Sequence, residues 1–177
     1  IAALKWRVAG DAIVDSDRLM PQIAVGGQFK HLNPGAAVGG VLDAVAARRR
    51  GVDLYASATK LFLAHGVLVN TTLRATKANQ NGLLGFGSSA SPGYRLAPEV
   101  SVAWLLHRDL AIGAEYRAKP DKLAFAGAAF TEDDWADVFV AWAPNKHVSF
   151  TAAWVDLGRI VGKPRQTGAY GSIQIAH

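Results

Sequence analysis

The stretch EVSVAWLLHRDLAIGAEYRAK, residues 99–119, decides the fold class of this chain. Apolar and polar side chains alternate along it on both sides of the central HRD, with Trp104 before the centre and Ile112 after it. Alternation with a period of two residues is typical of a β-strand that has one apolar face and one polar face. The stretch therefore predicts two antiparallel strands, residues 98–106 and 110–119, joined by a tight turn.

The pairing register of this hairpin follows from the rule that the apolar side chains of both strands share one face. A three-residue turn at 107–109 satisfies the rule, because it places Trp104 opposite Ile112. The same register places Glu99 opposite Arg117 on the polar face. Directly opposed residues have Cβ atoms about 4.5–5.5 Å apart, so we expect these two side chains to form an ion pair.

The same alternation recurs along the rest of the chain and predicts nine strands in total. The seven others cover residues 3–13, 21–31, 54–63, 67–76, 135–143, 148–155 and 169–176. The parity rule predicts two further three-residue turns, at 64–66 and 145–147, which place Lys60 beside Asn70 and Trp142 opposite Phe150. Such turns end in a left-handed residue, which Gly66 supplies freely and for which Asp109 and His147 are tolerated types.

One segment has the period of a helix instead. The run AAVGGVLDAVAARRR, residues 36–50, carries Val38, Val41, Leu42 and Val45 at helical spacing. Pro34 precedes it, and three arginines followed by Gly51 end it, which are ordinary start and stop signals. We predict a helical insertion at 35–50, with the arginines as a solvated last turn rather than a binding patch.

Composition excludes several classes of protein. The chain has 177 residues, no cysteine and 19% charged residues, which fits one globular domain and excludes a disulfide scaffold. Its mean hydropathy is +0.13, yet no charge-free apolar run reaches the length of a transmembrane helix. The net charge of +5 is spread along the chain without interleaved aromatic residues, so nucleic-acid binding is not expected.

The lengths of the connections favour a membrane barrel over a soluble sandwich or lipid-binding barrel. After the helical insertion, short connections alternate strictly with long ones, as in transmembrane barrels with short periplasmic turns and long outer loops. We therefore predict an all-β, antiparallel, up-and-down transmembrane β-barrel occupying residues 1–177. Single-chain bacterial barrels have even strand numbers with both ends periplasmic. An odd number of strands is thus expected before Ile1, unless neighbouring chains complete the barrel.

The polar face of the predicted strands is charged at mid-strand positions, which fits a polar lumen better than a solvent-exposed surface. The charged residues expected to face the lumen are Lys30, Lys60, Arg74, Glu99, Glu115, Arg117, Lys119 and Asp137, with Lys5, Arg7 and Asp11 on the same face. This set is more basic than acidic, so an open lumen would favour small anionic solutes. Charge pairs across the lumen would instead favour a plugged scaffold.

Three stretches of the chain resemble an uncharacterised family of Gram-negative bacterial proteins described only as a domain of unknown function. They are SATKLFLAHGVLVNTTLRATKANQNGLLGFG (57–87), LAIGAEYRAKPDKLAF (110–125) and DDWADVFVAWAPNKHVSFTAAWVDLG (133–158). The resemblance implies a β-barrel of the outer-membrane type. It implies no substrate and no catalytic residues.

Residues that carry chemistry do not form a recognisable catalytic or metal-binding pattern. His65, His107 and His147 fall in or beside short turns and have no ligand spacing. The acidic cluster 132–134 is interpreted as a solvated loop rather than a calcium site. The glycine-rich NGLLGFG, residues 81–87, lacks the lysine of a phosphate loop and is predicted to be a flexible outer loop. No enzyme, metal or cofactor is expected.

The sequence thus predicts a non-enzymatic outer-membrane β-barrel that acts as a pore or a structural membrane component. The alternative is a closed barrel that acts as a scaffold or a lipid-binding module. The expected partners are membrane lipid, small anionic solutes if the lumen is open, and a protein partner or second copy.

Overall fold

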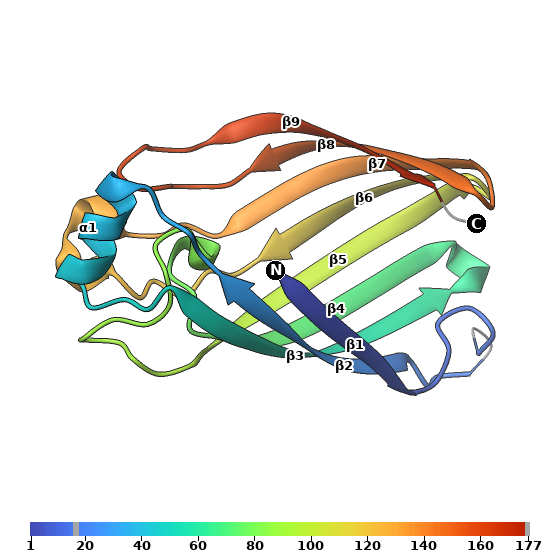
Figure 1. Ribbon diagram of the computed structural model, residues 1–177. Coiled ribbons are helices and arrows are strands. Elements are labelled where there is room, and N and C mark those ends of the chain that lie inside the picture. Colours follow the sequence, from blue (N-terminus) through green and yellow to red (C-terminus); the bar gives the residue numbers. More distant parts are fainter. Residues whose placement is uncertain (16–17, 176–177) are drawn as a thin grey trace.

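The computed structural model describes residues 1–15 and 18–175. Within these residues the chain forms nine strands in a single antiparallel sheet whose spatial order follows the sequence (Figure 1). The strands are β1 (Ala2–Ala9), β2 (Gln22–His31), β3 (Arg50–Phe62), β4 (Val67–Thr76), β5 (Arg95–His107), β6 (Leu110–Arg117), β7 (Trp135–Asn145), β8 (Val148–Asp156) and β9 (Thr167–Ile175). The prediction of an all-β antiparallel fold is confirmed.

The sheet is curved but open. In the part of the chain that the structure describes, β1 and β9 do not pair with each other, so these strands do not close into the predicted barrel. The connections that follow β2, β4, β6 and β8, with α1 (Ala36–Ala44) in the first of them, gather at one end of the strands, and the short turns lie at the other end together with the β1–β2 connection (Figure 1). Among the residues described, no helix is long and apolar enough to cross a membrane.

The register of the hairpin β5–β6 agrees with the prediction along most of its length. Trp104 pairs with Ile112 and Glu99 with Arg117, as expected. Next to the turn the ladder shifts and His107 pairs with Leu110, so a bulge takes up the extra residue of the predicted three-residue turn.

The hairpin β7–β8 behaves in the same way. Trp142 pairs with Phe150, and a register shift before Asn145 absorbs the difference at the turn. Because the bulge in each hairpin takes up one residue, the turn is shorter than predicted and needs no residue in the left-handed conformation. Neither Asp109 nor His147 is among the residues with positive φ in the described chain, so that expectation is wrong.

The register of β3–β4 differs from the prediction by one residue. Leu63–His65 form a 3₁₀ turn that Gly66 closes at φ +63°, so four residues connect the strands instead of three. Lys60 therefore pairs with Val69 and does not lie beside Asn70. The glycine takes the left-handed conformation expected of it, but the extra helical turn changes the parity.

The helical insertion is shorter than predicted. α1 ends at Ala44, and Ala46 has a positive φ of 53° that turns the chain out of the helix. The arginines consequently lie outside the helix. Arg48 pairs with Phe86 in an isolated β-bridge, and Arg50 begins β3. The prediction of a basic last helical turn at 35–50 is wrong.

The main hydrophobic core lies among the long connections rather than on the sheet. Val45, Leu84 and Leu123 are buried against one another, with Val38 and Phe130 at the margin of the cluster. Segments 32–49, 77–94 and 118–134 therefore pack together at one end of the sheet. The prediction that 81–87 is a flexible loop is wrong, because Leu84 is 2% exposed and Phe86 is 3% exposed.

Candidate functional site

The register divides the side chains of the sheet into two faces of opposite character. We call one the polar face, which carries Lys5, Gln28, Lys30, Asp53, Tyr55, Arg74, Thr76, Glu99, Glu115, Arg117 and Asp137. We call the other the apolar face, which carries Leu54, Leu73, Val102, Trp104, Ile112, Val138, Val140, Trp142, Phe150, Trp154 and Ile173, all of them exposed.

Asp53 is the centre of a charged network on the polar face. It has no exposed surface, and one carboxylate oxygen accepts a hydrogen bond from Lys30 Nζ at 2.6 Å. The other oxygen accepts one from Thr76 Oγ1 at 2.5 Å. A buried carboxylate is tolerated only when it is paired and hydrogen-bonded, and these contacts meet both conditions.

Arg74 joins Asp53 to the next acidic residue of the network. Its guanidinium donates two hydrogen bonds to the Glu99 carboxylate, at 2.6 and 3.3 Å, and lies 3.9 Å from an oxygen of Asp53. It also donates to Gln28 Oε1 and lies over the ring of Tyr55, 5.3 Å from the centroid. The two-pronged contact with Glu99 has the geometry of the strongest ion pairs in proteins.

The predicted ion pair between Glu99 and Arg117 is confirmed. Arg117 Nε lies 3.4 Å from Glu99 Oε1, and the guanidinium lies 5.6 Å from the centroid of the Trp135 ring. The shorter contact of Glu99 is nevertheless with Arg74, at 2.6 Å. The sequence register identified the neighbour across β5–β6 but not the closer partner from β4.

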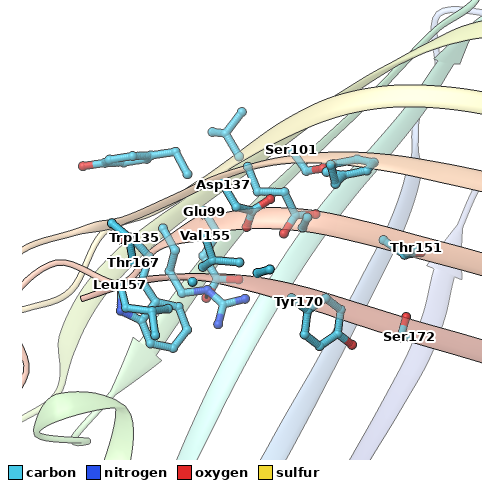
Figure 2. A pocket seen from close by; sticks show the side chains of 18 of the residues that line it. Glu99, Ser101, Trp135, Asp137, Thr151, Val155, Leu157, Thr167, Tyr170 and Ser172 are labelled. Atoms are coloured by element: carbon cyan, nitrogen blue, oxygen red, sulfur yellow. Dashed lines mark ion pairs between the residues drawn. The ribbon is translucent and has the colours of Figure 1, made fainter. Parts of the chain in front are cut away.

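A groove of about 860 Å³ extends along the polar face from β4 to β9. Figure 2 shows Glu99 and Asp137 beside Trp135 on one side of it, and Thr151, Tyr170 and Ser172 on the other. The groove is mixed in character, because Phe139, Val155 and Leu157 line it beside the carboxylates and hydroxyls. Its β8–β9 side carries no charged residue among those described.

Glu115 and Asp137 face each other directly across β6 and β7. In the described chain neither carboxylate has an ion-pair partner within 4.0 Å, whereas Lys30 and Arg74 are both paired with acids. The predicted basic surplus on this face is therefore largely neutralised around Asp53 and Glu99. The groove itself is more acidic than the sequence count suggested.

Three residues predicted to line the lumen lie elsewhere or at its edge. Lys60 lies on the other face of the sheet from Asn70. It is buried, and its ammonium donates hydrogen bonds to the backbone carbonyls of Asp15 and Arg18. Lys119 follows the end of β6 and donates to the carbonyl of Leu157 at 3.0 Å. Asp11 follows the end of β1 and accepts hydrogen bonds from two backbone N–H groups of its own turn.

The acidic cluster 132–134 connects the long loops, while Asp133 and Asp134 remain exposed to solvent as predicted. Glu132 accepts a hydrogen bond from the backbone N–H of Gln80 at 2.9 Å, Asp133 accepts one from that of Arg159 at 3.1 Å, and Asp134 accepts one from that of Lys119 at 2.9 Å. Burial raises the pKa of Glu132 to about 7, although the hydrogen bond from Gln80 opposes the shift.

The described residues contain no group of three or more His, Cys, Asp or Glu side chains that could hold a metal ion. His107 instead pairs with Asp109 within its own turn, which lowers the pKa of that carboxyl. The arrangement on the polar face is one of fixed, mutually compensated charges. It can position polar solutes or water, and it can hold neighbouring strands in register.

Comparison with known proteins identifies the family. A family model described as "Protein of unknown function (DUF3034)" matches residues 1–174. The chain belongs to this family. No curated protein and no solved structure matches it. The DUF3034 description assigns no activity, so the function of this member has to be argued from its own residues.

Asp53 is the one central residue that sequence reasoning missed. The predicted strand began at Leu54, so Asp53 was assigned to the preceding connection. The alternation Asp53, Tyr55, Ser57 continues backward from the predicted strand without a break. Extending the predicted strand backward by one residue places Asp53 on the polar face, where it pairs with Gln28 and lies diagonally across from Lys30.

Proposed function

We propose that this DUF3034 protein is a non-enzymatic component of an outer-membrane β-barrel, with the apolar face of its sheet against lipid and the polar face toward the barrel interior. The observation that carries the proposal is the contrast between the two faces. Apolar side chains such as Val138 and Trp154, each 58% exposed, lie on one face, while the buried ion pairs lie on the other. Exposed apolar surface of this extent marks a contact with lipid or with another protein.

The lengths and ends of the strands support the same proposal. The strands contain 8 to 13 residues, and a tilted transmembrane strand needs about 9–11. On the apolar face Trp104, Trp142 and Phe150 lie near the short turns, and Tyr116 and Trp154 lie toward the long loops. Two bands of aromatic residues are typical of the two interfaces of a membrane barrel.

Lipid contact requires that the backbone groups of β1 and β9 find partners, because unpaired edges are not tolerated in hydrocarbon. The proposal therefore includes additional strands beside β1 and β9, contributed by further sequence or by a second copy of the chain. These strands would convert the groove of about 860 Å³ into part of a lumen.

A closed structural barrel is favoured over an open anion pore by one specific observation. The basic side chains Lys30 and Arg74 are paired with Asp53 and Glu99, so they leave little free positive charge to attract anions. The packed loop segments at one end of the sheet add a physical obstruction. If solutes do pass, the free carboxylates of Glu115 and Asp137 favour small cations or neutral polar molecules.

Two experiments test the proposal. The protein is refolded into phosphatidylcholine vesicles and floated on a density gradient, and its gel migration is compared with and without heating. Co-flotation and a heat-dependent shift are expected of an inserted barrel. A protein that stays at the bottom of the gradient would contradict the membrane assignment. Planar-bilayer recordings then separate the two forms, since a closed barrel gives no discrete conductance steps and a pore does.

A further inference from the structure

A second cavity, of about 480 Å³, lies at the long-loop end of the sheet. It is formed by the last residues of β2, the segment 46–52 and the loop between β4 and β5. Figure 1 shows these segments side by side below α1. The polar residues that line the cavity are Arg48, Arg50, Lys77, Ser88, Ser89 and Tyr94.

The backbone fixes the two arginines on the same side of the chain. The Arg48 backbone exchanges hydrogen bonds with Phe86, at 3.0 and 2.8 Å, and Arg50 is the first residue of β3. Residues two apart in extended backbone point to the same side, and Arg49 between them does not line the cavity. Gly51 allows this arrangement, because a Cβ there would lie 2.1 Å from the Phe86 ring.

The charge of the cavity is positive and uncompensated. Its lining contains no Asp or Glu, and within the described residues Arg48, Arg50 and Lys77 form no ion pair. Lys77 lies over the ring of Tyr94, 4.7 Å from the centroid. Just outside the lining, burial lowers the pKa of Lys122, and the neighbouring charges of Arg95 and Lys77 lower it further. Several cations thus share a region that offers an anion both charge and hydroxyl donors.

The cavity also reaches the apolar face. Phe29 and Val52 line it and pair with each other across β2 and β3. Both are exposed, at 48% and 39%, and both belong to the face that the proposed function places against lipid. The cavity therefore lies where the apolar face meets the loops, which is the level of lipid headgroups in a membrane barrel.

We propose that this cavity binds the phosphate-bearing headgroup of a membrane lipid, with Arg48, Arg50 and Lys77 around the phosphate and the acyl chains along Phe29 and Val52. The proposal rests on the proposed membrane function, because only a lipid uses the basic cavity and its apolar rim together. A free phosphate would use the cations alone.

The test uses the whole protein in detergent micelles, with native mass spectrometry as the readout. Phosphatidic acid and phosphatidylcholine with identical acyl chains are titrated separately, and inorganic phosphate is added as a competitor. The variant Arg48→Gln/Arg50→Gln removes two charges from the cavity. The matched control, Arg108→Gln/Lys146→Gln, removes two exposed charges from the short turns at the opposite end of the sheet.

The wild type and the control variant are expected to prefer phosphatidic acid over phosphatidylcholine, and the cavity variant to bind phosphatidic acid about 30-fold more weakly. Equal loss in both variants would overturn the site, because it would reflect net charge alone. Displacement of phosphatidic acid by millimolar inorganic phosphate would overturn the lipid assignment in favour of a free anion.

Flotation with phosphatidylcholine vesicles separates the two proposals. A wild type that inserts into these vesicles but shows no preference for phosphatidic acid refutes the headgroup site and leaves the membrane function standing. A wild type that inserts into no vesicle refutes the membrane function, and the headgroup proposal fails with it.

Discussion

Replacing Asp53 by Asn tests whether the ion-pair network on the polar face holds the sheet together. Asp53→Asn keeps the shape of the side chain and an acceptor for Thr76, but it removes the charge that faces Lys30 Nζ at 2.6 Å. The side chains of Asp53 and Lys30 are 1% and 15% exposed, so water replaces little of what is lost. Breaking a buried pair at one partner costs about 3–5 kcal/mol, and we expect a loss near the lower limit because Lys30 keeps some solvent.

The assay is urea unfolding of the folded protein in detergent micelles or vesicles, followed by tryptophan fluorescence. Asp53→Asn, Lys30→Met and the double variant form a thermodynamic cycle. Asp53→Asn leaves the Lys30 ammonium without its partner, and Lys30→Met leaves the Asp53 carboxylate with only the longer contact to Arg74, at 3.9 Å. The double variant removes both charges. The double variant is therefore expected to be more stable than the sum of the single losses predicts, by about 2–3 kcal/mol.

A matched exposed pair provides the control. Arg165 Nε lies 2.9 Å from Asp156 Oδ2, nearly as close as the buried pair, but the Arg165 side chain is 80% exposed. Arg165→Gln is expected to change the free energy of unfolding by less than about 1 kcal/mol. If Asp53→Asn is equally mild, or if the cycle is additive, the network does not stabilise the fold and the argument from burial is refuted.

Three further predictions concern the apolar face, the loop core and the long-loop carboxylate. Val140→Arg is expected to lower the free energy of unfolding in vesicles by about 2–4 kcal/mol, and Ala141→Arg on the polar face is expected to lower it less. Equal losses would contradict the assignment of the two faces to lipid and interior. Leu123→Ala, at a residue with no exposed surface, should cost about 2–5 kcal/mol and expose the loops to protease, and unchanged proteolysis would contradict a packed loop core. The pKa of Glu132 is raised to about 7, so the wild type loses stability as pH rises from about 4.5 to 7. Glu132→Gln should therefore leave the free energy of unfolding unchanged near pH 4, where both side chains are neutral, and raise it above pH 7. The gain in thermal or urea stability at pH 8 is expected to reach up to about 3 kcal/mol, and an unchanged difference between pH 4 and pH 8 would show that the carboxyl titrates normally.

The strands, their order and most of their pairing follow from the alternation pattern of the amino-acid sequence. Alternation with a period of two identifies a strand and assigns its faces at once, and parity then leaves few registers for a hairpin. This is why the pairs Trp104–Ile112 and Trp142–Phe150 and the Glu99–Arg117 contact were predicted from local sequence alone. Errors arose where one extra residue was absorbed locally, by a bulge or by the 3₁₀ turn at 63–65, because such adjustments have no periodic signal.

The packing at the long-loop end and the partners of the charged side chains depend instead on contacts between segments far apart in the sequence. Leu84 and Leu123 are buried because loops far apart in sequence pack on α1, and an irregular loop carries no pattern that predicts its burial. Arg74 of β4 pairs with Glu99 of β5 at 2.6 Å, and Asp53 of β3 lies 3.9 Å from the same guanidinium. Such contacts depend on side-chain reach across a curved sheet, whereas alternation specifies only the face. The charge of the groove therefore depends on which side chains the curved sheet and the loops bring together. A count of charged residues along the strands does not predict it.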